Sequence, residues 1–150
     1  MKTKEEKAAA IFNTLKNDIK TRQMEKYIQH GRISTYRHCI NVTKTACKIN
    51  RKLHLNANEE TLVKGAMLHD FYLYDWHNKD NGTHDWHGYR HADTARKNAI
   101  EKFGVDEDVQ HIIWCHMWPL NITRVPRTKE AWIVCMSDKL CSFVETVFER

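Results

Sequence analysis

Histidine is the residue type in this sequence that is best suited to chemistry. The chain contains ten histidines in 150 residues, and five of them fall between residues 69 and 91. These five are His69, His77, His84, His87 and His91. Imidazole nitrogen is a common ligand of zinc, iron and nickel, and it also transfers protons near neutral pH. The concentration of histidine therefore indicates where a reactive centre is to be sought.

One pair within this segment has the geometry for binding metal. His69 and Asp70 are adjacent at the end of an apolar helical stretch. Neighbouring helical residues point about 100° apart, and a carboxylate has two oxygens. His69 can thus bind one cation, while Asp70 reaches the same cation and bridges to a second. The doublet favours a dinuclear centre.

Such a centre needs donors from other elements, and the sequence supplies His38, His87, His116 and Asp138. Asp138 stands between apolar stretches, where a carboxylate is costly to bury without a partner such as a metal. Taken singly, His38 fits a hydrogen-bonded core histidine and Asp138 fits an ion pair with Lys139 or an arginine. Their joint presence favours metal binding.

The hydrophobic periodicity predicts helices that position these residues. The expected helices cover about 4–20, 35–53, 59–70, 91–103, 106–116 and 128–148, with a short turn at 24–29. Residues 71–90 break the helical pattern and hold six of the fifteen aromatics, so they are interpreted as a site loop. Five glycines and two prolines provide few of the tight turns that a β-sandwich needs. We expect an all-α fold in a single domain, 1–150, on which residues 1–30 pack as an N-terminal helical extension.

Composition excludes several classes of protein. Apolar residues are 41% and charged residues 29%, which is typical of globular domains, and no apolar run is long enough to span a membrane. The first residues lack the features of a secretory signal, so a cytoplasmic location is expected. Residues 1–54 carry 13 Lys and Arg against 4 acidic residues, but at helical spacing. This pattern favours solvated helix faces over a nucleic-acid surface. The five cysteines are expected to be reduced.

The order His38, His69-Asp70, His87, His116, Asp138 resembles that of the HD-domain superfamily of metal-dependent phosphohydrolases. The resemblance covers about residues 33–145, and the stretches HGYRHAD and HMWPL are similar to a small bacterial subgroup of single-domain HD proteins. It implies an all-α helical bundle. It also implies that His38, His69, Asp70 and Asp138 hold one metal, and that Asp70, His87 and His116 hold a second.

The resemblance implies hydrolysis of a nucleotide or another small phosphorylated metabolite at this centre. Nitrogen and oxygen ligands suit one or two divalent ions, of iron or manganese, with nickel or zinc as alternatives. Two such cations make a nucleophile from water at neutral pH and neutralise phosphoryl charge, with Asp70 as the shared ligand.

Cations beside the expected ligands are candidates for contacting the substrate phosphate. Arg90 is the first candidate, Lys139 the second and Arg37 the third. Phe71, Tyr72 and Leu73 follow the doublet where many HD proteins place a lysine. The contact to the substrate phosphate that this lysine usually makes must therefore come from another residue in this chain.

Other side chains of the segment have two interpretations each. His84 and His91 could donate a proton to the leaving oxygen, or they could order the loop and the metal ligands. The loop aromatics Phe71, Tyr72, Tyr74 and Trp76 fit packing better than a platform for a nucleobase.

Two other functions stay open at this point. One is a ligand-sensing or nucleic-acid-binding module that keeps the fold without turnover and uses the basic first third to hold an anion. The other is an oxygen-using di-iron enzyme, because a few HD relatives use a similar centre for oxidative cleavage.

Overall fold

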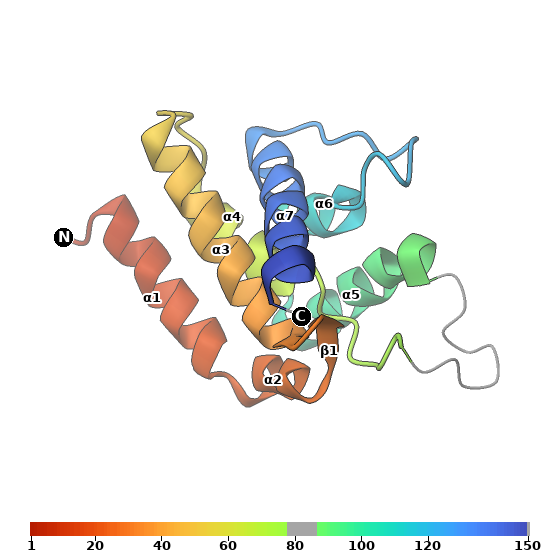
Figure 1. The fold of residues 1–150 in the computed structure, drawn as a ribbon. Coiled ribbons are helices and arrows are strands. Elements are labelled where there is room, and N and C mark those ends of the chain that lie inside the picture. Colours follow the sequence, from red (N-terminus) through yellow and green to blue (C-terminus); the bar gives the residue numbers. More distant parts are fainter. Residues whose placement is uncertain (78–86, 150) are drawn as a thin grey trace.

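The chain folds into seven α-helices and one small β-hairpin within the residues described (Figure 1). The computed structural model describes residues 1–77 and 87–149. The helices are α1 (Lys4–Asn17), α2 (Ile19–Arg22), α3 (Thr35–Lys52), α4 (Glu59–Leu68), α5 (His87–Phe103), α6 (Glu107–Cys115) and α7 (Lys129–Phe148). A 3₁₀ turn, η1 (Gln23–Lys26), leads into β1 (Ile28–His30), which pairs antiparallel with β2 (Ile33–Ser34). The expected all-α bundle is confirmed. Within these ranges, no helix combines the length and apolarity that crossing a membrane requires.

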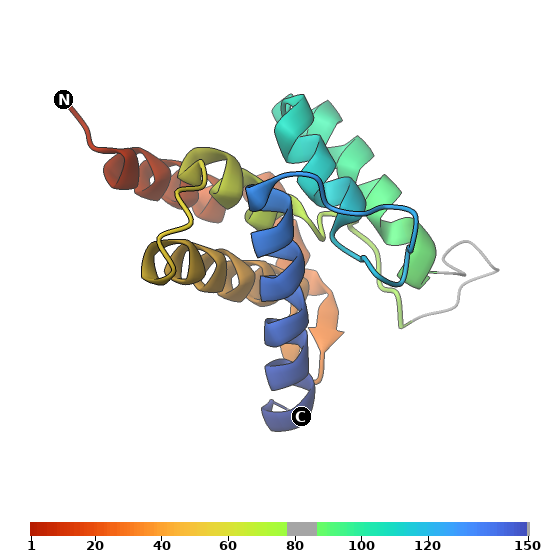
Figure 2. The same cartoon turned by 90° about the horizontal axis from the view of Figure 1, so that it is seen from above.

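The helices form two sets with α7 between them (Figure 2). On one side α1 and α3 pack against α4, and on the other side α5 packs against α6. Helix α7 contacts α3, α4 and α6, so it joins the two sets. The two hydrophobic clusters of the core each span both sets, because α3, α4 and α6 contribute residues to both clusters. Side chains directly after α4 and α6 are thereby brought close to the first turn of α3 and the middle of α7.

Helix α4 is the buried centre of this arrangement. Asn58 caps its N-terminus by accepting hydrogen bonds from the backbone of Glu60 and Thr61. A Cβ on Gly65 would lie 2.6 Å from Cδ1 of Ile112, so the glycine permits the close approach of α4 to α6. This approach fixes the position of the residues that follow α4, His69 and Asp70.

Three local features differ from the sequence-based expectation. The first helix ends at Asn17 because Asp18 adopts an extended backbone, and its side chain caps α2. The β-hairpin around Gly31 was not expected, since strands of three and two residues are too short to show an alternating pattern. Helix α5 begins at His87, one turn before the expected start at His91.

Candidate metal centre

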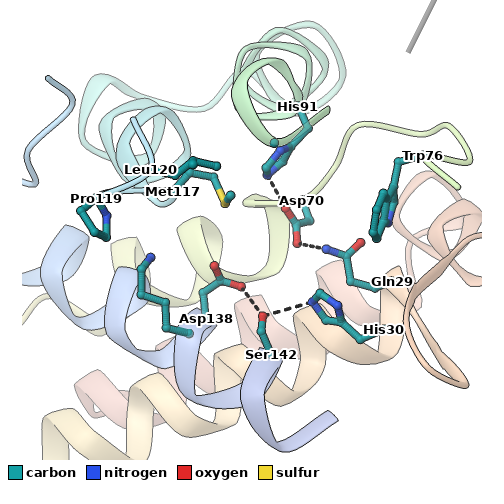
Figure 3. Close-up of a pocket in the computed structure, with 12 residues that line it drawn as sticks. Gln29, His30, Asp70, Trp76, His91, Met117, Pro119, Leu120, Asp138 and Ser142 are labelled. Carbon is teal, nitrogen blue, oxygen red and sulfur yellow. Dashed lines mark hydrogen bonds and ion pairs between the residues drawn. The ribbon is translucent and has the colours of Figure 1, made fainter. Parts of the chain in front are cut away.

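Six buried histidine and aspartate side chains converge between the two sets of helices. They are His38 in α3, His69 and Asp70 directly after α4, His91 in α5, His116 directly after α6, and Asp138 in α7. Each is at most 6% exposed. Asp70 and His91 face each other across the centre, and Asp138 approaches it from α7 (Figure 3). A helix end or a helix face therefore positions every member.

Asp70 divides its two oxygens between two groups of ligand atoms. Oδ2 lies 3.2 Å from Nε2 of His69 and 3.4 Å from Nε2 of His38. Oδ1 lies 3.2 Å from Nε2 of His91 and 3.3 Å from Nε2 of His116. One carboxylate thus serves two neighbouring sets of histidines.

Asp138 completes the first group. Its Oδ1 lies 2.9 Å from Nε2 of His38 and 3.4 Å from Nε2 of His69. The first group is therefore His38, His69, Asp70 and Asp138, and the second is Asp70, His91 and His116. Within each group, the ligand atoms lie within 4.8 Å of one another.

The spacing and the chemistry of these atoms fit divalent cations. Ligand atoms about 2.1 Å from one cation lie about 3.0–3.4 Å from each other in octahedral or tetrahedral geometry. The closest pairs in both groups span a similar range, as given above. In addition, His69 Nε2 and Asp70 Oδ1 are buried and make no hydrogen bond within the described structure. A bound cation would give both atoms a partner.

Hydrogen bonds on the far side of three histidine rings turn Nε2 toward the centre. Nδ1 of His69 donates to the Ala66 carbonyl, and Nδ1 of His116 donates to the Ile113 carbonyl, both at 2.7 Å. Each carbonyl lies one helical turn earlier, so the end of the helix itself orients the ring. Nδ1 of His38 pairs with Oε2 of Glu145 at 2.6 Å. These bonds select the tautomer that leaves Nε2 free for a metal.

Gln29 in β1 orients Asp70. Its Nε2 donates to Oδ2 of Asp70 at 3.0 Å. Its Oε1 accepts hydrogen bonds from the hydroxyls of Tyr72 and Thr35. Because the two hydroxyl groups both donate to Oε1, the amide nitrogen of Gln29 must face Asp70. The small hairpin thus fixes the bridging carboxylate from outside the helices.

The ionisation of the cluster reflects competition between burial and ion pairing. Burial lowers the pKa of His38, but hydrogen bonds to Asp138, Asp70 and Glu145 outweigh it and hold the pKa well above its ordinary value. Burial raises the pKa of Asp138, yet the histidines reverse this effect and hold that pKa well below its usual range. For His116 burial dominates and lowers the pKa. In the metal-free protein, the positive charge of protonated histidines in the first group therefore offsets the negative charge of Asp70 and Asp138.

A cavity of about 720 Å³ opens onto the centre. Asp70, His91 and Asp138 form its polar floor, and Lys139 also lines it. The other lining residues are Gln29, His30, Trp76, Gly88, Met117, Pro119, Leu120 and Ser142. The cavity gives a small molecule access to the metal-ligand atoms.

Most of the candidate residues from the sequence meet at this centre. His38, His69, Asp70, His116 and Asp138 contribute as described above. His91, for which the sequence left proton donation and an ordering role open, lies in the second ligand group. The side chain of His87 and the whole of His84 lie outside the described residues. Their predicted roles stay predictions.

The three cations predicted to bind phosphate lie in different surroundings. Arg37 is exposed on α3 and does not line the cavity. Lys139 lines the cavity, where its Nζ donates to the His116 carbonyl at 3.1 Å. Arg90 is exposed on α5 and does not line the cavity. The cavity therefore favours Lys139 over Arg90 as the phosphate contact.

Sequence reasoning missed Gln29, His30 and Glu145. Glu145 follows Asp138 by two helical turns, so it shares the buried face of α7, and this spacing was a usable signal. His30 Nε2 and Ser142 Oγ lie 3.1 Å apart, and the Ser142 hydroxyl donates to Asp138 at 3.4 Å (Figure 3). Gln29 and His30 lie in a hairpin that showed no pattern in the sequence.

Comparison with known proteins gives one family. The family model described as the HD domain matches residues 35–142, which is most of the chain. The matched range begins at the start of α3 and ends within α7, so it includes every residue of both ligand groups. No curated protein and no solved structure matched the chain.

Proposed function

The chain belongs to the HD-domain family, and on this premise we propose that it is a divalent-metal-dependent phosphohydrolase with a dinuclear centre. The substrate is a nucleotide or another small phosphorylated metabolite. The observation that carries the proposal is Asp70, whose Oδ2 belongs to one ligand group and whose Oδ1 belongs to the other. A carboxylate shared in this way is the usual bridge between two cations about 3.5–4 Å apart.

The two groups of side chains would hold divalent cations with different strength. His38, His69, Asp70 and Asp138 provide four ligands, while Asp70, His91 and His116 provide three. The four-ligand group is expected to bind the tighter metal, and the three-ligand group leaves more positions for water and substrate. Divalent cations in these groups supply a nucleophile from water at neutral pH and neutralise phosphoryl charge.

Lys139 is the phosphate-binding residue in this proposal. Lys139 lines the cavity together with Asp138, and its ammonium group donates to the His116 carbonyl. Lys139→Ala should raise KM at least tenfold and leave the metal content unchanged. Arg90→Ala is the matched comparison and should change KM less, because Arg90 is exposed outside the cavity. If Arg90→Ala raised KM more than Lys139→Ala does, Arg90 and not Lys139 would be the phosphate-binding residue.

The test of the function combines metal analysis with turnover. Purified protein is depleted with chelator, reloaded with iron, manganese, nickel or zinc, and assayed for phosphate release from a panel of nucleotides and small phosphomonoesters. Two bound cations per chain with metal-dependent release support the proposal. Two bound cations without release from any compound would refute the hydrolase and favour a sensing module.

Measuring oxygen consumption distinguishes a di-iron oxygenase from the proposed phosphohydrolase. Histidine and carboxylate ligands suit ferrous iron as well as manganese, so the donor set does not distinguish the two activities. Oxygen consumption by the iron-loaded protein, without phosphate release from any compound, would favour the oxygenase and contradict the hydrolase.

A further inference from the structure

The cavity above the centre is larger and more apolar than binding of a phosphoryl group requires. Its volume is about 720 Å³, and a phosphate at its polar floor would occupy a small part of it. The polar side chains gather around Asp70 and Asp138: Gln29 donates to Asp70, and Ser142 donates to Asp138 and pairs with His30. His91 and Lys139 complete the polar lining. The remainder must receive the group to which the phosphate is attached.

The side walls of this remainder are apolar on two opposite sides (Figure 3). Trp76 stands on one side next to Gln29, and Met117, Pro119 and Leu120 stand on the other. Gly88 lets the first turn of α5 approach this wall, since a Cβ there would lie 3.2 Å from Cδ2 of Leu120. A ligand between the walls would contact an aromatic ring on one side and aliphatic groups on the other.

This lining selects among phosphorylated compounds. Hydroxyl groups of a sugar would lose their water partners against Trp76 and Leu120, which is unfavourable. A hydrocarbon ring would gain from the same burial. Lys139 is the one Lys or Arg among the described residues that line the cavity, which matches a single phosphate better than a polyphosphate chain.

We propose that the substrate is a phosphomonoester of an apolar alcohol, whose aromatic or branched hydrocarbon group lies between Trp76 and Leu120. The proposal rests on the phosphohydrolase function proposed above. In the reaction, the oxygen of water bonds to phosphorus and the bond from phosphorus to the alcohol oxygen breaks. The alcohol leaves with one proton of the water, and the other proton stays with inorganic phosphate.

Binding of phosphonates tests the apolar subsite without turnover. Calorimetry on manganese-loaded protein should show that benzylphosphonate binds at least about tenfold more tightly than methylphosphonate. Trp76→Ala and Leu120→Ala should each remove most of this preference, while Trp76→Phe should keep it. Leu53→Ala, at an exposed leucine outside the cavity, is the control and should leave it unchanged. Equal binding of the two phosphonates would overturn the proposal.

Turnover separates this inference from the proposed function. Benzyl phosphate and ribose 5-phosphate are both esters of primary alcohols, so their intrinsic reactivity is similar. We expect kcat/KM at least tenfold higher for benzyl phosphate. Equal or reversed values would overturn the apolar preference and leave the phosphohydrolase standing. Release with no metal from either ester or from any compound of the panel above would overturn the phosphohydrolase, while the calorimetric preference would still support or reject the apolar subsite.

A second observation concerns the outer face of α7. Trp132, Met136, Leu140, Phe143 and Val147 are all large, apolar and between 39% and 63% exposed. At 100° per residue they fall within an arc of about 80°, and Asp138 and Glu145 lie on the opposite side. We call these five residues the outer strip. Helix α7 is thus apolar on its outer face as well as on the face it buries, although a helix that is apolar all round is normally buried.

The outer strip has the properties of a surface that pairs with itself. The steps Met136, Leu140, Phe143 and Val147 alternate four, three and four residues, which is the spacing of a seam between two packed helices. The strip contains no charged residue, so two copies would not repel each other. With Val144 and Phe148 beside it, the strip exposes on the order of 700 Å², within the roughly 600–1,000 Å² that each partner buries in a standard interface.

We infer that two copies of this chain pair through the outer strips of α7 about a two-fold axis. The same patch then faces itself, and one helix covers the other. The cavity stays open because Asp138 and Ser142, which line it, lie about 120° or more around α7 from the middle of the outer strip. Lys139 lies at the edge of the strip.

Light scattering and sedimentation test the pairing across about 1–100 µM protein. The parent should be a dimer, and Phe143→Lys and Leu140→Lys should each be monomeric with an unchanged circular dichroism spectrum. Ile19→Lys, at an exposed apolar residue on another surface, is the control and should stay dimeric. A monomeric parent at 100 µM, or a dimer that survives both substitutions in the strip, would overturn the inference.

Discussion

Asp70→Asn tests the bridging role with the smallest change of shape. Gln29 donates to Oδ2 of Asp70 at 3.0 Å, and the donors on its own oxygen fix its orientation. The asparagine carbonyl should therefore take the position of Oδ2, which places the amide NH₂ at the position of Oδ1. There it faces Nε2 of His91 and His116, at 3.2 and 3.3 Å in the parent. An amide NH₂ cannot bind a cation, so the second group loses its only carboxylate.

The magnitude follows from the linkage of binding to folding. A metal present at 100 times its Kd stabilises the folded state by about 2.7 kcal/mol per site. For a chain of this length, about 1 kcal/mol shifts Tm by roughly 2–4 °C, so each site contributes about 5–11 °C. Asp70→Asn should lose one site and weaken the other, because a neutral oxygen replaces a charged one beside His38 and His69.

The assay compares metal content, turnover and the Tm difference between metal-loaded and chelator-treated protein. We expect two metals for the parent, one for His91→Ala, and less than one, with no turnover, for Asp70→Asn. The same measurement on His87→Ala tests the ligand set implied by the sequence resemblance. If Asp70→Asn kept two metals, full turnover and the parental Tm difference, the dinuclear interpretation would be wrong.

Three further predictions concern the groups around the ligands. Burial lowers the pKa values of His38 and His69, but their carboxylate partners outweigh burial and raise both values well above 6.5. Protonation of these histidines therefore stabilises the metal-free protein. This stability is lost as the pH rises through the raised pKa values. Metal-loaded protein lacks these protons, and thermal melts should therefore show a larger gap between loaded and metal-free protein at higher pH. Glu145→Gln should weaken metal affinity about 10–100-fold in competition with a chromophoric chelator, because the partner of His38 Nδ1 is no longer charged. Gly65→Ala should cost about 1–3 kcal/mol in chemical denaturation, since its Cβ would overlap Ile112; an unchanged midpoint would show that α4 and α6 can separate freely.

Local sequence was sufficient for most of the helices and for the main ligands. The caps at Asn58, Asp106 and Thr128 are local hydrogen bonds within three residues, so they can be read without knowledge of the fold. The His69-Asp70 doublet is covalently adjacent, and its two residues act together for that reason. The buried faces of α3 and α7 follow from helical spacing, which places His38 and Asp138 inward.

The tertiary structure decided what depends on contacts between distant segments. Helical periodicity alone assigns His87 and His91, four residues apart in the sequence, to the same side of a helix and cannot choose between them. His91 reaches Asp70 because α5 packs on α6 beside His116. Gln29 is 41 residues from Asp70, and its hairpin carries no repeating pattern. Glu145 and His38 are 107 residues apart. Helical spacing tells which face of an element is buried, but only the packing of the elements determines which side chains from other segments meet that face.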